Sequence, residues 1–193
     1  YEHLVYGGAV HKSPAEFGPE HFKNTVILHG LAKGWSMTGW RLGFTCGAKE
    51  IISAMDNLQS HQTSNPTSFA QYGGLAALTQ PMTHLPEWLR VFDERRRMLV
   101  QRLNAISGVK CPEPRGAFYV FPDVSAFYGR TVCGKRVTDS LTMAEALLEG
   151  AQVAVVPGVA FGDDRCMRLS YAIATKAIEK GIARIEKALG EAS

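Results

Sequence analysis

The hydrophobic positions of the chain alternate between short apolar runs and longer stretches with helical spacing. Runs at residues 25–28 and 42–46 are bounded by glycine and predict two buried strands. Residues 49–60 place isoleucine, methionine and leucine three or four positions apart, which is typical of a helix. Two further helices are expected at 66–78, where proline suits the first turn, and at about 87–106.

The second half of the chain mixes short strands with helices. Strands are expected at residues 109–111, 118–121, 153–156 and 167–171, and helices at 141–149 and 175–189. Residues 129–139 are polar and show no periodicity, so we expect an exposed loop. This order of elements indicates a small α+β domain at the C-terminal end of an α/β chain.

The composition is typical of a globular protein, with 46% hydrophobic and 20% charged residues. The formal net charge is only +3, and basic residues are spread along the sequence. One basic cluster, residues 95–97, lies in an amphipathic segment, and we interpret it as a solvated helix face. A nucleic-acid site would need a denser basic patch. No apolar run is long enough to span a bilayer. We therefore expect neither nucleic acid nor membrane as a partner.

The ends and the cysteines add two expectations. The four cysteines are widely spaced and form no CxxC pair, so we expect reduced thiols in the cytoplasm and no zinc site. No signal peptide is recognised either. The chain opens inside an apolar run, YEHLVY, without a polar leader, and we expect it to be part of a longer protein.

Two cationic residues, Lys33 and Arg41, lie between the first two predicted strands. A buried ammonium is costly unless it is paired or neutralised, and imine formation is one use of such a lysine. A guanidinium offers a bidentate fork that suits a phosphate. The spacing alone favours the plainer interpretation, in which both are solvated loop residues.

A third cation, Arg168, alternates with apolar residues in the segment MRLSY. It is either a carboxylate anchor or part of the solvated face of a half-buried sheet. Periodicity does not separate these two interpretations.

A family resemblance changes this balance. The segment HGLAKGWSMTGWRLGF resembles the lysine motif of class I aminotransferases of fold type I, in which MTGWR(I/L)G follows the lysine. Other segments resemble further parts of that family, in the expected order: YEHLVY, SNPTSFAQ, GAFYVFPD, VAVVPGVAFG and MRLSYA. Together they cover essentially the whole chain, and the bacterial aspartate aminotransferase-like branch is the most similar.

The resemblance implies a fold and an assembly. Residues 1–90 would be the C-terminal part of the large domain, mainly parallel sheet with helices, which binds pyridoxal 5′-phosphate (PLP) and carries the lysine. Residues 91–193 would form an interdomain helix and a small α+β domain. Intact relatives are homodimers, so a homodimer is expected here.

The resemblance also implies residue roles. Lys33 would form the Schiff base with PLP and then move a proton between the substrate and the cofactor. Arg41 would bind the cofactor phosphate, and Tyr1 would hydrogen-bond the cofactor O3′. Arg168 would hold the substrate α-carboxylate. Asn65 would reach the partner subunit's site, although an asparagine before proline is more commonly a local turn former.

The implied reaction is transamination between an amino acid and a 2-oxo acid, with aspartate and 2-oxoglutarate as the expected pair. Two alternatives stay open: another fold-type-I PLP enzyme, such as a β-lyase or a synthase, and a truncated fragment without activity. The family aspartate that pairs with the cofactor ring nitrogen would precede Tyr1. Gly30 also stands where many relatives have a phosphate-binding Ser or Thr. No residue is identified for a distal carboxylate.

Overall fold

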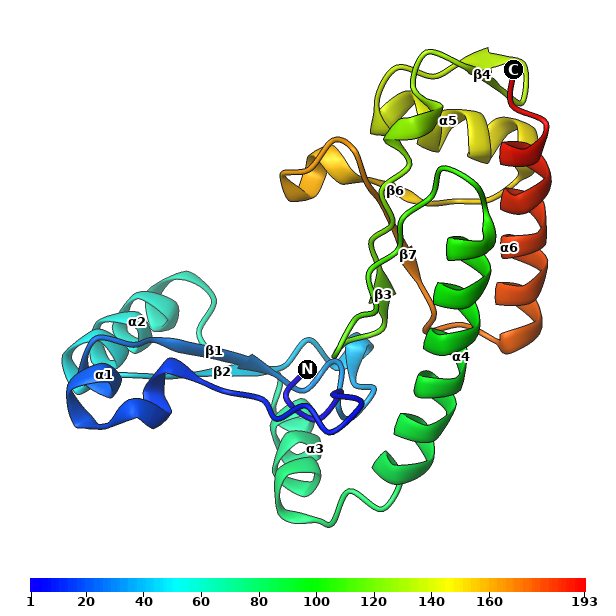
Figure 1. Ribbon diagram of the computed structural model, residues 1–193. Helices are drawn as coiled ribbons and strands as arrows, with labels where there is room; N and C mark the ends of the chain where they lie inside the picture. Colours follow the sequence, from blue (N-terminus) through cyan, green and yellow to red (C-terminus); the bar gives the residue numbers. More distant parts are fainter. The chain divides into compact units, whose positions relative to one another are not determined.

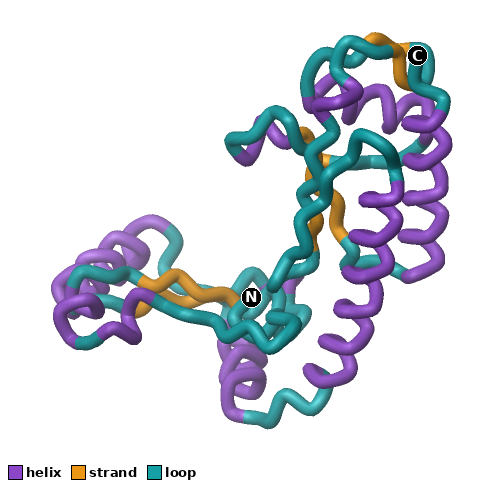
Figure 2. Tube along the Cα trace, viewed as in Figure 1, coloured by secondary structure: helices purple, strands orange, loops and turns teal.

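The computed structural model describes all residues 1–193, which divide into two compact units, Tyr1–Pro86 and Glu87–Ser193. Helices and strands occur in both units, which confirms the predicted α/β class (Figure 1; Figure 2). None of the helices is both long enough and apolar enough to cross a membrane.

The first unit combines one strand pair with short and medium helices. Its elements are η1 (Pro14–Phe17), α1 (Pro19–Lys23), β1 (Ile27–Gly30), η2 (Thr38–Trp40), β2 (Gly43–Cys46), α2 (Lys49–Gln62) and α3 (Ser68–Thr79). Helix α3 begins two residues later than expected, because the backbone of Thr67, the residue before the helix, has a non-helical ψ of 132°.

Strands β1 and β2 form an antiparallel pair in which Ile27 faces Cys46 and Gly30 faces Gly43. We expected a mainly parallel sheet, but every strand pair in this chain is antiparallel. A parallel pair needs a crossover connection, whereas the loop after Gly30 turns straight back into β2. The expectation of buried strands was also wrong, since Leu28 is 77% exposed and Phe44 is 41% exposed.

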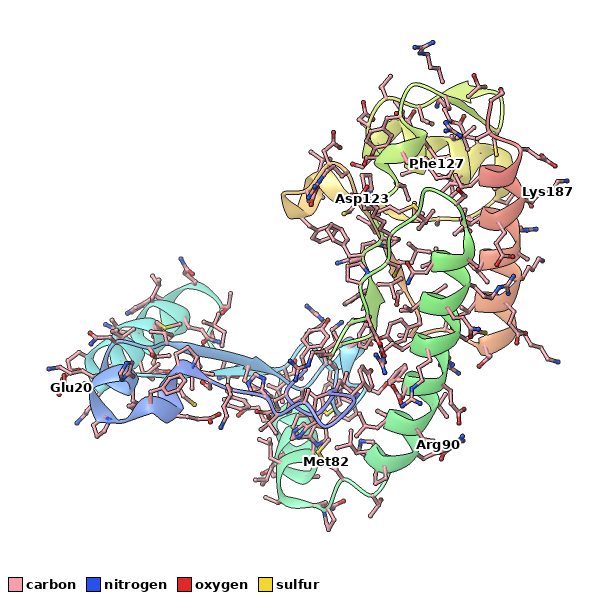
Figure 3. All side chains as sticks on the ribbon, viewed as in Figure 1. Glu20, Met82, Arg90, Asp123, Phe127 and Lys187 are labelled. Atoms are coloured by element: carbon pink, nitrogen blue, oxygen red, sulfur yellow. The ribbon has the colours of Figure 1, made fainter.

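The second unit contains the main hydrophobic core. Its elements are α4 (Leu85–Ala105, which begins at the end of the first unit), β3 (Tyr119–Val120), η3 (Ser125–Phe127), β4 (Thr131–Val132), β5 (Lys135–Arg136), α5 (Ser140–Ala151), β6 (Val156–Pro157), η4 (Gly158–Phe161), β7 (Met167–Ser170) and α6 (Thr175–Gly190). Strand β7 is central in the order β3-β7-β6. Helices α4, α5 and α6 contribute buried residues such as Leu103, Leu147 and Ile182 to the core, together with Phe127 of η3 (Figure 3).

Residues 129–139 are not the exposed loop that we expected. They form the β4–β5 hairpin, which turns at Cys133 and Gly134, both with positive φ. Val132 and Val137 are fully buried. Two-residue strands are too short for periodicity to reveal, which explains why the hairpin was missed.

The basic cluster at 95–97 is also not simply a solvated face. Arg96 is only 3% exposed, and its guanidinium donates to Asp93, Glu113 and the carbonyl of Pro114. Partial burial raises the pKa of Asp93, but the hydrogen bonds and charges of Arg96 and Arg97 together outweigh it and leave that pKa lowered. Arg96 is thus a buried ion-pair partner inside the second unit.

All four strands predicted in the second unit are shorter than expected, and two of them differ most. Residues 109–111 form only an isolated bridge, between Lys110 and Asp123, and the strand expected at 153–156 begins at Val156. By contrast, helices α2, α4, α5 and α6 all begin within two residues of their predicted starts.

Candidate functional site

Lys33 lies in the tight loop that joins β1 to β2. Leu31 is buried, its amide donates to the carbonyl of Leu42 (3.2 Å), and its carbonyl accepts from Met37 (3.4 Å). The carbonyl of Lys33 accepts from the amide of Ser36 (3.1 Å), and Lys33 is partly buried. The lysine backbone is therefore held in a defined turn between two strand ends.

Two residues of this loop, Ser36 and Arg41, adopt positive φ angles of 53° and 52°. Non-glycine residues rarely occupy this region, and such conformations gather at functional sites. The Arg41 side chain is exposed, donates from Nη1 to the carbonyl of Thr38 (2.9 Å) and forms no ion pair. Most of its donors therefore remain available for an anion.

Helix α3 approaches the loop through the glycine pair Gly73-Gly74. A Cβ at Gly73 would lie 2.4 Å from the Trp40 ring, and a Cβ at Gly74 would lie 2.4 Å from Leu42 and 3.0 Å from Leu31. Any larger residue would push this part of the loop away from the helix. This contact was not predicted from the sequence, although glycine within a helical pattern can have a packing reason.

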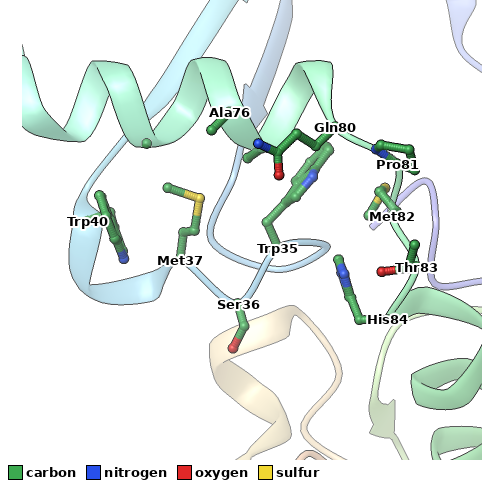
Figure 4. Close-up of a pocket in the computed structure, with 12 residues that line it drawn as sticks. Trp35, Ser36, Met37, Trp40, Ala76, Gln80, Pro81, Met82, Thr83 and His84 are labelled. Atoms are coloured by element: carbon green, nitrogen blue, oxygen red, sulfur yellow. The ribbon is translucent and has the colours of Figure 1, made fainter.

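A cavity of about 450 Å³ lies between the loop and the end of α3. Figure 4 shows Trp35, Met37 and Trp40 from the loop on one side, with Ala76 and Gln80 of the helix on the other. The cavity therefore borders the segment between Lys33 and Arg41.

Histidines surround the turn just after Lys33. The buried carbonyl of Gly34 accepts a hydrogen bond from His84 Nε2 (3.0 Å), and a Cβ at Gly34 would meet the His3 ring at 3.2 Å. The His3 ring also packs edge-on against Trp35, with the centroids 5.3 Å apart. These contacts, which the sequence analysis did not identify, hold the turn from outside the loop.

Glu2 links two of the residues around this turn. Its Oε1 lies 2.9 Å from His29 Nε2 and 3.2 Å from His3 Nε2. His29 stacks on Phe44, with the ring centroids 5.1 Å apart. Glu2 therefore ties the N-terminal segment to the strand that leads into the lysine loop.

Tyr1 and Asn65, the other expected site residues of this unit, are both exposed. The carbonyl of Tyr1 accepts from the amide of Leu4 (2.9 Å). Asn65 lies between α2 and α3, next to Ser64, whose φ is 66°. The Asn65 side chain forms no hydrogen bond within the chain.

Arg168 belongs to the second unit, on the central strand β7. Its neighbours Met167 and Leu169 contribute to the core, so Arg168 points to the other face of the sheet. Its guanidinium carbon lies 4.5 Å from the Tyr119 ring centroid and 4.3 Å from that of Phe161. It is partly buried, yet it forms no ion pair with the chain.

The register explains why Tyr119 reaches Arg168. Tyr119 faces Ser170, which lies on the same side of β7 as Arg168. Ala117, just before β3, has a φ of 61°, and its carbonyl accepts from the buried hydroxyl of Tyr171 (3.1 Å). The backbone that presents Tyr119 is thus anchored to the core.

The expected site residues therefore fall into two groups. Tyr1, Lys33, Arg41 and Asn65 lie in the first unit, and Arg168 lies in the second. Within the first unit, the loop from Leu31 to Leu42 joins Lys33 and Arg41 in one backbone structure.

Comparisons with known proteins agree with this picture. The sequence model of the family "Aminotransferase class I and II" matches residues 1–185. The chain is 47% identical to the aspartate aminotransferase of Streptomyces avermitilis, covering 100% of this chain and 47% of that protein. It is 44% identical to the aspartate/prephenate aminotransferase of Cereibacter sphaeroides, covering 96% of this chain and 47% of the relative.

Solved structures give the same result. The crystal structure of an aspartate aminotransferase from Rhizobium meliloti matches 100% of this chain and 48% of its own, with a TM-score of 0.94 and 39% identity. An aromatic aminotransferase from Pyrococcus horikoshii covers 99% of this chain and 49% of its own, with a TM-score of 0.88 and 35% identity. The chain thus spans about half the length of the relatives it matches.

Proposed function

Because this chain belongs to the aminotransferase class I and II family, we propose that the protein transfers an amino group from an amino acid to a 2-oxo acid. The observation that carries this proposal is the loop of Lys33, in which the lysine backbone is pinned and Arg41 presents a guanidinium without an ion pair. The chain spans about half the length of these relatives, so the complete reaction is part of this proposal.

Aspartate is the proposed amino donor and 2-oxoglutarate the proposed acceptor. The support is that relatives named aspartate aminotransferase match the whole chain, at 47% identity in Streptomyces avermitilis and 45% in Geobacillus stearothermophilus. The Cereibacter relative, named for both aspartate and prephenate, supports a dicarboxylic substrate class.

The cofactor of this family is PLP, whose aldehyde condenses with an amine and whose ring withdraws electrons from the bonds of a bound substrate. The first unit offers fitting residues. Lys33 would supply the amine and, when released, would take the proton from the substrate α-carbon. Arg41 would bind the phosphate through its unused donors, and the Tyr1 hydroxyl would hydrogen-bond the cofactor O3′.

Arg168 would bind the α-carboxylate of the substrate in a bidentate manner. A carboxylate held at two points keeps the α-carbon in one orientation, which favours proton removal in the correct direction. The partly buried guanidinium has no carboxylate partner within the chain, which supports this role.

Three further assignments belong to the same proposal. Residues 1–90 form part of the PLP-binding domain, and residues 91–193 form the interdomain helix and the small domain. The working enzyme is a cytoplasmic homodimer. Asn65, exposed and without a side-chain hydrogen bond, reaches the site of the partner subunit.

The proposal is tested by incubating the 193-residue chain with PLP, reducing with borohydride and mapping the modified peptide by mass spectrometry. We expect the label on Lys33 and its loss in Lys33→Ala, with Lys49→Ala as an exposed control that keeps it. Labelling that is unchanged in Lys33→Ala would contradict the assignment.

Product analysis separates the reaction types. With aspartate and 2-oxoglutarate, we expect glutamate to form in the wild-type protein and not in Lys33→Ala. Absence of glutamate here, together with release of pyruvate, ammonia and a thiol from a substrate with a sulfur leaving group on its β-carbon, such as cystathionine, would instead indicate a β-lyase. Specific labelling of Lys33 without any turnover would indicate a fragment that binds the cofactor but lacks activity.

A further inference from the structure

We propose that Phe161 is a positioning residue for Arg168, and that a hydrogen-bonded pair, Ser140 and Asp164, holds Phe161 in place. This inference rests on the proposed function only in the identity of the bound carboxylate. It concerns the second unit alone, in the segment between β6 and β7 (orange in Figure 1).

The short helix η4 carries Phe161 to the Arg168 guanidinium. It begins at Gly158, where a Cβ would lie 2.2 Å from the carbonyl oxygens of both Asp163 and Cys166, so only glycine fits. It ends at Phe161, and the capping residue that follows, Gly162, is left-handed with a φ of 85°. The two glycines allow η4 to fold back closely on the start of β7.

Ser140, in the first turn of α5, holds η4 in this folded-back position. Its side chain is completely buried, its Oγ accepts from the amide of Val159 (3.1 Å), and it donates to Asp164 Oδ1 (2.6 Å). The same Asp164 oxygen accepts from the Ser140 amide (3.1 Å). Ser140 and Asp164 therefore hold both ends of η4 against α5.

Asp164 has a second anchor through its backbone. Its carbonyl accepts a hydrogen bond from the Tyr128 hydroxyl (2.6 Å). The Phe161 ring itself packs edge-on against Phe121, at a centroid distance of 6.1 Å. These contacts leave the ring little freedom to move away from Arg168.

These contacts limit the orientations that the plane of the Arg168 guanidinium can take. A guanidinium that stacks on aromatic rings is held by its faces, while its N–H donors point outward along its edges. The Tyr119 and Phe161 ring centroids lie 4.5 Å and 4.3 Å from the Arg168 guanidinium carbon, and no carboxylate of the chain occupies its donors. The arrangement is thus prepared for an incoming planar carboxylate.

A neighbouring arginine shows the opposite arrangement. Arg165 is exposed and already paired with Asp163, to which it donates from Nε (2.9 Å) and Nη2 (2.7 Å). Asp163 is therefore a suitable control. It is adjacent to Asp164 in the sequence, but its carboxylate accepts hydrogen bonds from the Arg165 side chain and not from Ser140.

The test is a titration of the 193-residue chain with succinate, followed through the Nε–Hε signal of Arg168 in ¹⁵N NMR spectra. We expect Phe161→Leu to raise the Kd for succinate several-fold, because the freed guanidinium must be ordered on binding, with roughly thirtyfold, the whole cation–π contact, as the limit. Phe161→Tyr keeps an aromatic face and should bind as the wild type does. Because Phe161 is 48% exposed, neither change empties the core.

A second pair of variants tests Ser140 and Asp164. Asp164→Ala removes the acceptor and should weaken succinate binding in the same range, whereas Asp164→Asn retains an acceptor and should restore it. Asp163→Asn should leave binding unchanged. A purely structural role for Phe161 would lower the free energy of unfolding of Phe161→Leu without changing its Kd for succinate.

The outcomes separate this inference from the proposed function. Equal binding by wild type and Phe161→Leu, or no response of Arg168 to succinate, would overturn it. If Arg168 responds and the variants behave as expected while the protein shows no transamination, the inference holds and the proposed function fails.

Discussion

The four cysteines illustrate how burial decides the chemistry of single residues. All four are free, but Cys111 and Cys166 are buried while Cys46 and Cys133 are exposed. Burial raises the pKa of Cys111 to about 12 and that of Cys166 to about 11. Since the thiolate is the reactive form, the two buried thiols are almost entirely protonated and unreactive at neutral pH.

We therefore expect iodoacetamide at pH 7.5 to alkylate Cys46 and Cys133 in the folded chain and to spare Cys111 and Cys166. Peptide mass mapping checks the sites, and unfolding in guanidinium should make all four reactive. Equal rates at Cys111 and Cys133 in the folded protein would show that Cys111 is not protected as the structure indicates.

At the scale of elements, helix α5 begins with a strong capping interaction. Asp139 accepts from the amide (2.7 Å) and the hydroxyl (2.8 Å) of Thr142. The hydrogen bond from the Thr142 backbone lowers the pKa of Asp139. A lowered folded-state pKa means that the stabilisation is present above the ordinary aspartate pKa and is lost as the pH falls through the folded value.

We expect Asp139→Ala to reduce the free energy of unfolding by about 1 kcal/mol at pH 7. The difference from wild type should shrink below about pH 4, where the carboxylate takes up a proton. Urea unfolding followed by circular dichroism at pH 7 and pH 3 measures it. Asp139→Asn, which keeps a neutral cap, serves as control, and a pH-independent loss in Asp139→Ala would refute the charged cap.

At the scale of the whole molecule, buried apolar residues are unevenly divided. The connected core runs from Leu99 to Leu189 and lies entirely in the second unit. Helix α2 in the first unit contains no buried residue, whereas α6 buries five: Ile178, Ile182, Ile185, Ala188 and Leu189. Local stability depends on buried apolar contacts, so the free energy of local unfolding should differ between the two units.

Hydrogen–deuterium exchange with peptide mass spectrometry should reveal this difference in the 193-residue chain. We expect the amides of α5 and α6 to exchange slowest and those of α2 to exchange first. Equal protection of α2 and α6 would show that something other than the described core stabilises the first unit.

The helices and the family could both be predicted from the amino-acid sequence. Starts of α2, α4, α5 and α6 follow from apolar spacing, which is a local property, and the segment around Lys33 carries the resemblance that the family match bears out. The structure gives the position of each expected site residue, but their roles remain predictions; these residues are Lys33, Arg41, Tyr1, Asn65 and Arg168.

The contacts around these residues, by contrast, depend on the folded structure. Arg96 is buried because Glu113, seventeen positions away, reaches it. Gly73 admits Trp40 from the lysine loop, and Phe161 lies over Arg168 because Ser140, on α5, bonds the backbone of η4. Such partners are distant in sequence and carry no local periodicity, so no pattern along the chain could have identified them. Arg168 looked from its sequence like either a solvated cation or an anchor, and the two rings around its guanidinium favour the anchor.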